Sequence, residues 1–302
     1  MPDTPQRATL SVAIITFNEE ENIGRTLASV KDIADEIIVV DSGSTDRTIE
    51  IAKQLGAKVF VEEWKGFAAQ KNSALDKCTR DWILSLDADE EVDEFLSQEI
   101  QFVKGVQRVP SVPEQVERFR EETRKMRHLV HGGHAGGPEP SAYFISRKNL
   151  FLNKWIRHGG FYPDRKLRLM QRGMARFATR SVHESIEFGG VTRRMRGDLV
   201  HHQYPTLTAY IEHMNRYSSL GAEMVVEKRK HVGFSILNIV VRPIATFIYN
   251  YFLRLGFLDG KEGLLLHLYH SVYVSWKYAK AWEISRNRIR ASKETSRSEG
   301  SL

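Results

Sequence analysis

The 302-residue sequence contains a single cysteine, Cys78, and therefore no internal disulfide, which agrees with a reducing compartment. Residues 1–9 include charged Asp3 and Arg7 and two prolines but no apolar core. We therefore expect no secretory signal and a cytoplasmic location. The apolar runs in the last third stay below eighteen uninterrupted residues, which argues against a membrane-spanning helix.

Two common nucleotide-binding signatures are also missing. No G-x-G-x-x-G follows any strand that the sequence predicts, and G-x-x-x-x-G-K-[ST] does not occur. These absences disfavour a dinucleotide-dependent oxidoreductase and a P-loop NTPase.

Charge is divided unevenly along the chain. The first hundred residues carry ten Lys/Arg and twenty-one Asp/Glu, a net −11, so the remainder carries +17 to reach the total of +6. An acidic sheet edge accepts a diphosphate only when a cation intervenes, whereas a basic remainder suits a phosphorylated acceptor or an anionic membrane surface.

The most informative stretch is Trp82-Ile83-Leu84-Ser85-Leu86-Asp87-Ala88-Asp89, an apolar run that ends at two carboxylates. It predicts a buried strand that carries acids to its carboxyl end, where open α/β sheets bind ligands. Asp87 and Asp89 project to the same side of an extended segment and suit Mg²⁺ or Mn²⁺ shared with substrate phosphates. The alternative is a solvated acidic turn before a helix.

Strand and helix patterns alternate ahead of this stretch. Two β-branched runs end in polar residues, one before Thr16, Asn18 and Glu19 and the other at Asp41. The predicted strands are 10–15, 36–40, 58–61 and 82–87, with a helix after each of the first three. This alternation predicts an α/β fold with a mostly parallel sheet. Ala142–Ile145 and Lys166–Met170 are expected to complete the sheet.

Several ordered motifs carry a resemblance to a known family. The motifs T-F-N-E-E-E-N-I, V-V-D-S-G-S-T-D, Q-K-N-S-A-L and L-S-L-D-A-D-E-E are followed by G-G-F-Y-P-D-R-K-L-R-L and S-V-H-E. Together they resemble the inverting nucleotide-sugar glycosyltransferases of family 2, in the subgroup of lipopolysaccharide core β-glucosyltransferases. The resemblance implies a GT-A fold, a nucleotide diphosphate sugar as donor and a divalent metal, Mg²⁺ or Mn²⁺.

The resemblance also assigns roles to individual residues. It implies nucleotide-sugar contacts for Thr16, Asn18, Glu19, Asp41, Lys71, Asp87 and Ala88, and metal contacts for Asp87 and Asp89. Lys71 has an equally good interpretation as a surface charge on an amphipathic helix. Asp41 stands at a strand end, where its carboxylate can accept a hydrogen bond from a base or a ribose.

The catalytic pair is expected at His183-Glu184. Inverting transfer needs a base that takes a proton from the acceptor hydroxyl, and the resemblance implies this role for Glu184. His183 either orients the acceptor or contacts the diphosphate. Trp155, Arg165 and Arg168 are the expected acceptor or phosphate contacts, because sugars stack on aromatic rings and guanidinium groups grip phosphate. Core packing is the alternative for Trp155.

The last third is predicted to be helical. Aromatic and cationic residues flank broken apolar runs between 232 and 280, a composition typical of helices that lie in a membrane interface. A homodimer interface is the alternative. The predicted organisation is a catalytic domain at 8–220, a membrane-interface or dimer region at 221–284 and a disordered basic tail at 285–302. Within the domain, 8–100 forms the nucleotide-sugar half, 101–140 a helical insertion and loop, and 141–220 the acceptor half.

We therefore expect a metal-dependent glycosyltransferase that moves a hexose such as glucose to a lipid-linked saccharide at the cytoplasmic face of a membrane, attached peripherally. A polyprenyl-phosphate sugar synthase differs only in its acceptor. A metal-dependent nucleotidyltransferase would keep the D-x-D motif but release diphosphate. A basic nucleic-acid-binding protein would need no metal, and no nucleic-acid partner is expected.

Overall fold

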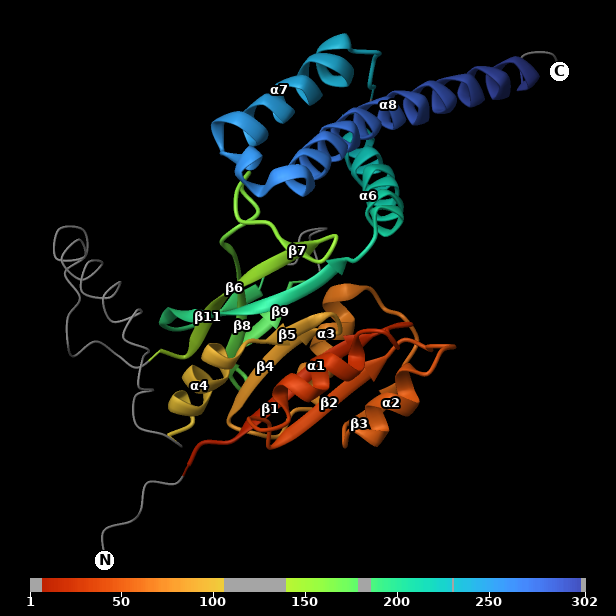
Figure 1. Ribbon diagram of the computed structural model, residues 1–302. Helices are drawn as coiled ribbons and strands as arrows, with labels where there is room; N and C mark the ends of the chain where they lie inside the picture. The colour runs from red at the N-terminus through yellow and green to blue at the C-terminus, as the bar shows by residue number, and fades with distance from the viewer. Residues whose placement is uncertain (1–6, 106–139, 179–185, 230, 300–302) are drawn as a thin grey trace, which may run out of the picture. The chain divides into compact units, whose positions relative to one another are not determined.

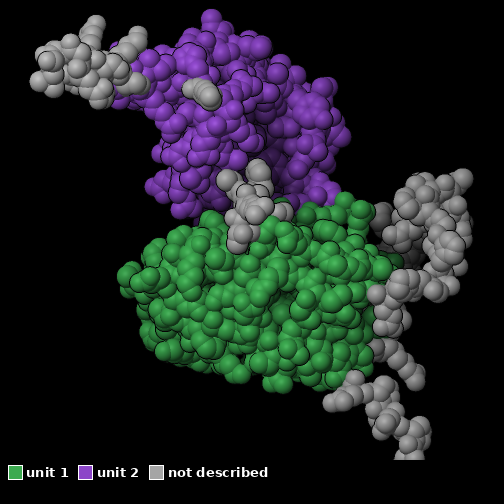
Figure 2. Space-filling view, turned by 180° about the vertical axis from the view of Figure 1, so that it is seen from behind, with its two compact units in different colours: residues 1–147, 165–201 green, residues 148–164, 202–302 purple. Residues whose placement is uncertain are grey.

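The computed structural model describes residues 7–105, 140–178, 186–229 and 231–299 (Figure 1). The chain divides into two compact units, shown in different colours in Figure 2. Unit 1 comprises residues 1–147 and 165–201, and unit 2 comprises residues 148–164 and 202–302. Each unit is therefore assembled from two separate stretches of chain.

The first half of unit 1 confirms the predicted parallel sheet. Strands β1 (Leu10–Thr16), β2 (Glu36–Asp41), β3 (Lys58–Val61) and β4 (Trp82–Asp87) lie in the order β3-β2-β1-β4. Helices α1 (Ile23–Val30), α2 (Thr48–Gln54) and α3 (Phe67–Asp76) connect them. Thr16 pairs with Asp41 and Ile15 with Asp87, so the three strands deliver their polar ends to one edge.

The sheet continues beyond β4 with strands that come from later in the chain. Strand β8 (Asp164–Gln171) pairs antiparallel with β4, and β6 (Ala142–Phe151), β11 (Thr192–Tyr204) and β5 (Glu90–Val92) follow in that order. Helix α4 (Glu94–Val103) follows β5. Strand β7 (Lys154–Trp155) pairs with β6, and a separate ribbon joins β9 (Ala175–Phe177) to β10 (Ile186–Phe188). The two predicted completing strands are confirmed.

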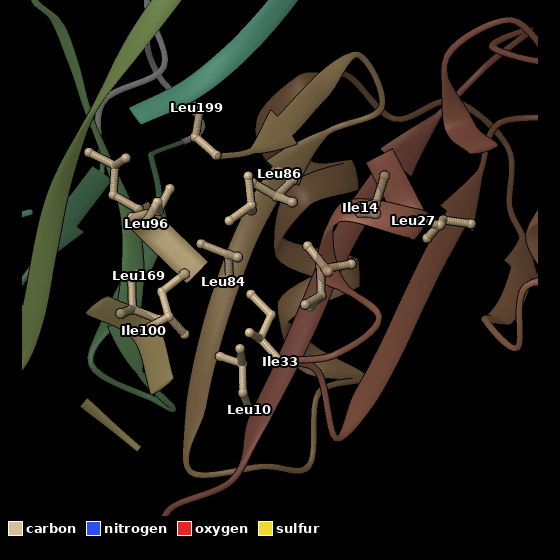
Figure 3. Packing of buried hydrophobic residues seen from close by; sticks show 14 of the residues in the cluster. Leu10, Ile14, Leu27, Ile33, Leu84, Leu86, Leu96, Ile100, Leu169 and Leu199 are labelled. Atoms are coloured by element: carbon tan, nitrogen blue, oxygen red, sulfur yellow. The ribbon is translucent and has the colours of Figure 1, made fainter. Parts of the chain in front are cut away.

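The core of unit 1 follows the period-two alternation of the central strands. Leu10, Val12 and Ile14 of β1 pack into one cluster, whereas Ala13 packs into a second. Because successive side chains of a strand point to opposite faces, the two clusters lie on opposite faces of the sheet. Figure 3 shows the first cluster, where helix residues meet the strand side chains. The labelled residues are Leu10, Ile14, Leu27, Ile33, Leu84, Leu86, Leu96, Ile100, Leu169 and Leu199.

Unit 2 is largely helical. It contains α6 (Leu207–Lys228), a continuous helical stretch made of η1 (Leu237–Val241), α7 (Arg242–Ile248) and η2 (Tyr249–Leu253), then η3 (Gly256–Asp259) and α8 (Gly260–Glu299). Its core joins Phe151 and Ile156 of the 148–164 segment to Tyr210 of α6 and Leu266 of α8. In the part of the chain that the structure describes, no helix has the length and apolarity needed to cross a membrane.

The two compact units differ from the predicted organisation of 8–220, 221–284 and 285–302, which stays a prediction. Helix α6 and residues 148–164 are grouped in unit 2. The tail predicted to be disordered from Ser285 is helical, because α8 continues to Glu299. Residues 285–299 contain four Arg, two Glu, one Lys and one Ala, all of which have good helix propensity. The predicted insertion at 101–140 lies largely outside the described residues.

Candidate functional site

The loops that follow β1 and β2 are tied together at the carboxyl edge of the sheet. Asn18 has a positive φ of 53°, which asparagine tolerates better than most residues. Its backbone N–H donates to Ser44 Oγ at 2.8 Å, and its Oδ1 accepts from Thr45 N at 2.8 Å. Glu19 N donates to Thr48 Oγ1 at 2.8 Å. Asn18 and Glu19 are therefore positioned by the β2 loop, as a preformed binding edge requires.

Asp41 and Thr16 lie side by side in this edge and are both buried. The Asp41 carboxylate accepts from the backbone N–H groups of Gly43, at 2.9 Å, and Ser44, at 2.8 Å, and from the Ser44 hydroxyl. Asp41 thus shapes its own loop, and its predicted contact with a base or ribose stays a prediction. Thr16 Oγ1 is buried without a hydrogen-bond partner in the described residues.

Asp87 lies in a cluster of buried cations. Lys71 Nζ is 2.8 Å from Asp87 Oδ1, and Arg168 Nη2 is 2.6 Å from Asp87 Oδ2. Arg168 Nη2 also lies 2.6 Å from Oε1 of fully buried Glu90, which Arg147 approaches to 3.3 Å. Lys71, Arg168 and Arg147 therefore converge on the carboxylates of Asp87 and Glu90.

The electrostatics of this cluster keep Asp87 ionised. Burial by itself would raise the pKa of Asp87, but the charges of Arg168 and Lys71 outweigh burial and hold the pKa well below its usual range. The predicted phosphate contact Arg168 and the predicted nucleotide contact Lys71 are both almost fully buried against this carboxylate. The Asp87 carboxylate therefore holds Lys71 and Arg168 in place at the end of β4.

Asp89 faces a different partner. Its Oδ2 lies 3.3 Å from Nε2 of His201, and about a fifth of the Asp89 side chain is exposed, at 21%. His201 stands on β11 opposite Glu90 of β5. Between the two acids, the buried residue Ala88 accepts a hydrogen bond on its carbonyl from Thr26 Oγ1 at 2.7 Å, which fixes the turn. Asp87 and Asp89 are thus directed to different neighbours.

Glu19 is the third acid of the edge. Burial is the main cause that raises the pKa of Glu19 to about 7, and the charges of Asp89, Asp46 and Asp87 act in the same direction. A 2.8 Å hydrogen bond from Asn22 Nδ2 works against them. A raised carboxyl pKa among like charges indicates a place where an added cation would be stabilising.

A divalent cation that is also coordinated by substrate phosphates requires few ligands from the protein, and the sheet edge provides such donor atoms. The described residues contain no group of three or more His, Cys, Asp or Glu side chains able to hold a metal. Asp89 and His201 offer one oxygen and one nitrogen donor, while Asp87 is already paired with cations. Mg²⁺ and Mn²⁺ commonly use one or two protein ligands together with substrate phosphates.

The remaining predicted site residues are the catalytic pair and the acceptor contacts, and they lie in different parts of the chain. Glu184 and His183 lie outside the described residues. Arg165, at the start of β8, is exposed. Trp155 belongs to unit 2, where Arg157 lies over its ring at 4.2 Å from the centroid and Lys148 lies at 5.3 Å. This arrangement combines an aromatic surface with two cations, which a phosphorylated saccharide could use.

Three members of the site escaped the sequence analysis: Glu90, Arg147 and His201. Glu90 lies within the D-A-D-E-E run, where we interpreted the later acids as a helix start. Arg147 and His201 come from strands β6 and β11, which join the site only through long-range pairing. The signal available in the sequence was a polar residue within a β-rich segment, which is too common to single out Arg147 or His201.

Comparison with known proteins gives a consistent family. The model of the family described as "Glycosyl transferase family 2" matches residues 11–176. An uncharacterized glycosyltransferase of Rickettsia typhi is 31% identical, covering 91% of this chain and 87% of its own length. The lipopolysaccharide core biosynthesis glycosyltransferase LpsC of Rhizobium meliloti is 30% identical, covering 83% and 82%. The mannosyltransferase PcManGT of Pyrobaculum calidifontis, solved with GDP-Man and Mn²⁺, is 15% identical with a TM-score of 0.49, covering 93% and 89%.

Proposed function

The chain belongs to glycosyl transferase family 2 and is a glycosyltransferase with a GT-A-like α/β fold, and on this premise we propose that it transfers a hexose from a nucleotide diphosphate sugar to a lipid-linked saccharide. One observation carries the proposal: β1, β2 and β4 bring Glu19, Asp41 and the Asp87–Asp89 pair to one sheet edge. Ligands of open α/β sheets bind at this edge.

The donor is proposed to lie across the loops after β1 and β2. The buried Thr16 hydroxyl lacks a protein partner among the described residues and is available to a base or ribose, while Asn18 and Glu19 are held beside it. The diphosphate end would then point toward β4. The Lys71, Arg168 and Arg147 charges around Asp87 favour an anion in that direction.

The geometry favours Asp89 over Asp87 as the residue that holds a divalent metal, with His201 as its partner. Asp87 would act beside it, by fixing Lys71 and Arg168. Mg²⁺ or Mn²⁺ bound there would take up negative charge as the diphosphate leaves. Glu19, whose neutral form is favoured without a cation, would ionise when one is present.

Glu184 is proposed as the general base. It would remove the proton from the acceptor hydroxyl while that oxygen forms a bond to the anomeric carbon. The bond from this carbon to the diphosphate oxygen breaks on the opposite side, and the nucleotide diphosphate leaves with the electron pair. His183 is proposed to orient the acceptor.

The acceptor assignment is supported by the relative LpsC, whose name places it in lipopolysaccharide core biosynthesis. Trp155, with Arg157 and Lys148 at its ring, is proposed to contact the saccharide or its phosphate, and exposed Arg165 is a second candidate. A lipid-linked acceptor would place the enzyme at the cytoplasmic face of a membrane, attached peripherally.

The test is a panel of nucleotide sugars incubated with the protein and Mg²⁺, Mn²⁺ or a chelator, with released nucleotide diphosphate as the readout. The expected result is metal-dependent release of UDP or GDP from one donor, accelerated by a lipid-linked saccharide. Release of inorganic diphosphate would identify a nucleotidyltransferase instead. Acceleration by a polyprenyl phosphate, but not by a saccharide, would select the polyprenyl-phosphate sugar synthase.

A further inference from the structure

The helical stretch 237–253 of unit 2 exposes apolar side chains along its whole length. Leu237, Val241, Ile244, Ile248 and Phe252, which we call the outer stripe, are spaced three or four residues apart along it. Each is between 46% and 65% exposed. The stretch is π-helical in η1 and η2 and α-helical in α7. Val240, Tyr249 and Leu253 widen the outer stripe and are also exposed.

The opposite face of the same helix is already occupied. Buried Pro243 lies on it, and Ser275 of α8 donates from Oγ to Ile239 O at 2.8 Å. Figure 1 shows α7 running beside α8, with which it is in contact. Arg242 donates to the Tyr278 hydroxyl of α8. One face of the helix is therefore in contact with α8, while its solvent-facing side is apolar, where ordinary surface helices carry polar residues.

The charges around the outer stripe are of one sign. Residues 228–258 contain no Asp or Glu and five cations: Lys228, Arg229, Lys230, Arg242 and Arg254. The next acid, Asp259, is buried and accepts from the backbone N–H groups of Arg157 and His158. An apolar stripe with only cations beside it is complementary to an apolar layer that has anionic groups at its edge.

We propose that the outer stripe lies in the interfacial layer of an anionic lipid bilayer, whose headgroups attract the cations of residues 228–258. Immersing the five side chains removes apolar surface from water, and long arginine side chains reach the headgroups while their stems stay apolar. This surface is argued from unit 2 alone and does not depend on the proposed reaction.

A second copy of the chain fits this surface less well. In a two-fold dimer the same patch meets itself, so the cations near the outer stripe would face one another. Residues 228–258 contain no acid that could neutralise them. A bilayer with anionic headgroups supplies that counter-charge.

The experiment is co-sedimentation of the full chain with phosphatidylcholine vesicles that contain or lack phosphatidylglycerol. The test variant is Ile244→Gln with Ile248→Gln. The matched control is Leu55→Gln with Phe102→Gln, which changes two exposed apolar residues of unit 1. We expect the full chain to bind anionic vesicles several-fold more tightly than neutral ones, since each cation near the surface contributes about fivefold. The test variant should bind at least about tenfold more weakly, and the control should bind like the unchanged chain.

Three outcomes would overturn the proposal. The first is no sedimentation with either vesicle, and the second is equal binding by the test variant and the unchanged chain. The third is that the unchanged chain and the control are dimers whereas the test variant is a monomer. The last outcome would make the outer stripe a subunit interface. Nucleotide-sugar hydrolysis is measured in the same samples without vesicles. Hydrolysis without vesicle binding removes the bilayer proposal, and with it the peripheral membrane attachment, but leaves the proposed nucleotide-sugar transfer standing. Vesicle binding without hydrolysis keeps the bilayer proposal and removes the proposed transfer.

Discussion

Arg168 donates from Nη2 to Oε1 of Glu90 at 2.6 Å, and the two side chains are 3% and 0% exposed. The same Nη2 lies 2.6 Å from Asp87 Oδ2, so one buried guanidinium joins the strand β8 to the end of β4 and the start of β5. Removing it would leave two carboxylates in a dry environment with fewer cations.

We therefore expect Arg168→Met to lower the free energy of unfolding by about 3–5 kcal/mol, the usual effect of breaking a buried pair. Arg165→Met changes an exposed arginine on the same strand and should stay within about 0.5 kcal/mol of the unchanged chain. Urea unfolding of both variants is the measurement. Equal stability of the two variants would show that the guanidinium is not needed to balance Asp87 and Glu90.

The two acids of the D-x-D motif should respond differently to substitution. Asp89→Asn should keep the melting temperature but abolish the stabilisation that Mn²⁺ with a nucleoside diphosphate gives the unchanged chain. Asp87→Asn should lower the melting temperature without ligand, because Lys71 and Arg168 lose a charged partner. Thermal melts with and without Mn²⁺ separate the two effects. Full metal-dependent stabilisation of Asp89→Asn would contradict the metal role of Asp89.

Glu19 should make stability depend on pH in a direction that is opposite to that of most carboxylates. Burial raises the pKa of Glu19 from an ordinary value of 4.5 to about 7, so the folded chain binds a proton that the unfolded chain releases. The folded state therefore loses stability as pH rises through this window, by about 1–3 kcal/mol between about pH 5 and about pH 8.

Glu19→Gln cannot ionise and should lack this loss. The measurement is urea unfolding of both chains across this pH range, where the difference between them isolates Glu19 from other titrating groups. Parallel profiles would mean that Glu19 has an ordinary pKa in the folded chain.

Glu184 should affect transfer and not donor binding. As a general base it acts on the acceptor, so Glu184→Gln should lower the transfer rate by roughly 10²–10⁴-fold while the donor dissociation constant stays nearly unchanged. Single-turnover transfer and calorimetric binding of the donor measure the two quantities. Loss of donor binding would move Glu184 into the nucleotide site, and near-normal transfer would remove it from catalysis.

Gly159 has a positive φ of 65°, and an added Cβ would stand 2.0 Å from Cε1 of His267. We expect Gly159→Ala to destabilise the chain by about 2–4 kcal/mol through backbone strain and overpacking. Gly233→Ala is the control, because nothing lies within 4 Å of the Cβ position there. Circular dichroism melts compare the two. A stable Gly159→Ala variant would show that His267 can move away.

The strands and helices of the first half of unit 1 were predictable because they depend on residue patterns that are local in the sequence. The strands β1 to β4 and the edge at which Asp41 and Asp87 end follow from β-branched runs that alternate with amphipathic helices. Alternation on β8 did not place Arg168, because Leu167, Arg168 and Leu169 are buried in succession where side-chain clusters cover both faces of the sheet. Burial of Arg168 depends on its ion pairs with Asp87 and Glu90, which come from another segment of the chain.

The glycine pair in the H-G-G-F motif shows a second limit of sequence analysis. Glycine permits close approach, so the sequence leaves open whether Gly159 and Gly160 make room for a ligand or for another part of the chain. In the structure, His267 approaches Gly159 and Arg254 approaches Gly160, both from within unit 2. A glycine in the sequence indicates that another group approaches the backbone closely but does not identify that group. Here only the long-range contacts with His267 and Arg254 identify it.

Unit 2 is built from residues 148–164 and 202–302, so its core cannot be completed until the second stretch has been synthesised. Phe151 and Ile156 share a core with Leu266, which follows Ile156 by 110 residues in the chain. A ribosome that adds about 5–20 residues per second needs about 5–20 s to produce that partner. Tyr204 and Tyr210 of the same core are made earlier, so during this interval Phe151 and Ile156 can pack only against an incomplete core. The last helix therefore sets the time at which the nascent chain stops offering that segment to other proteins.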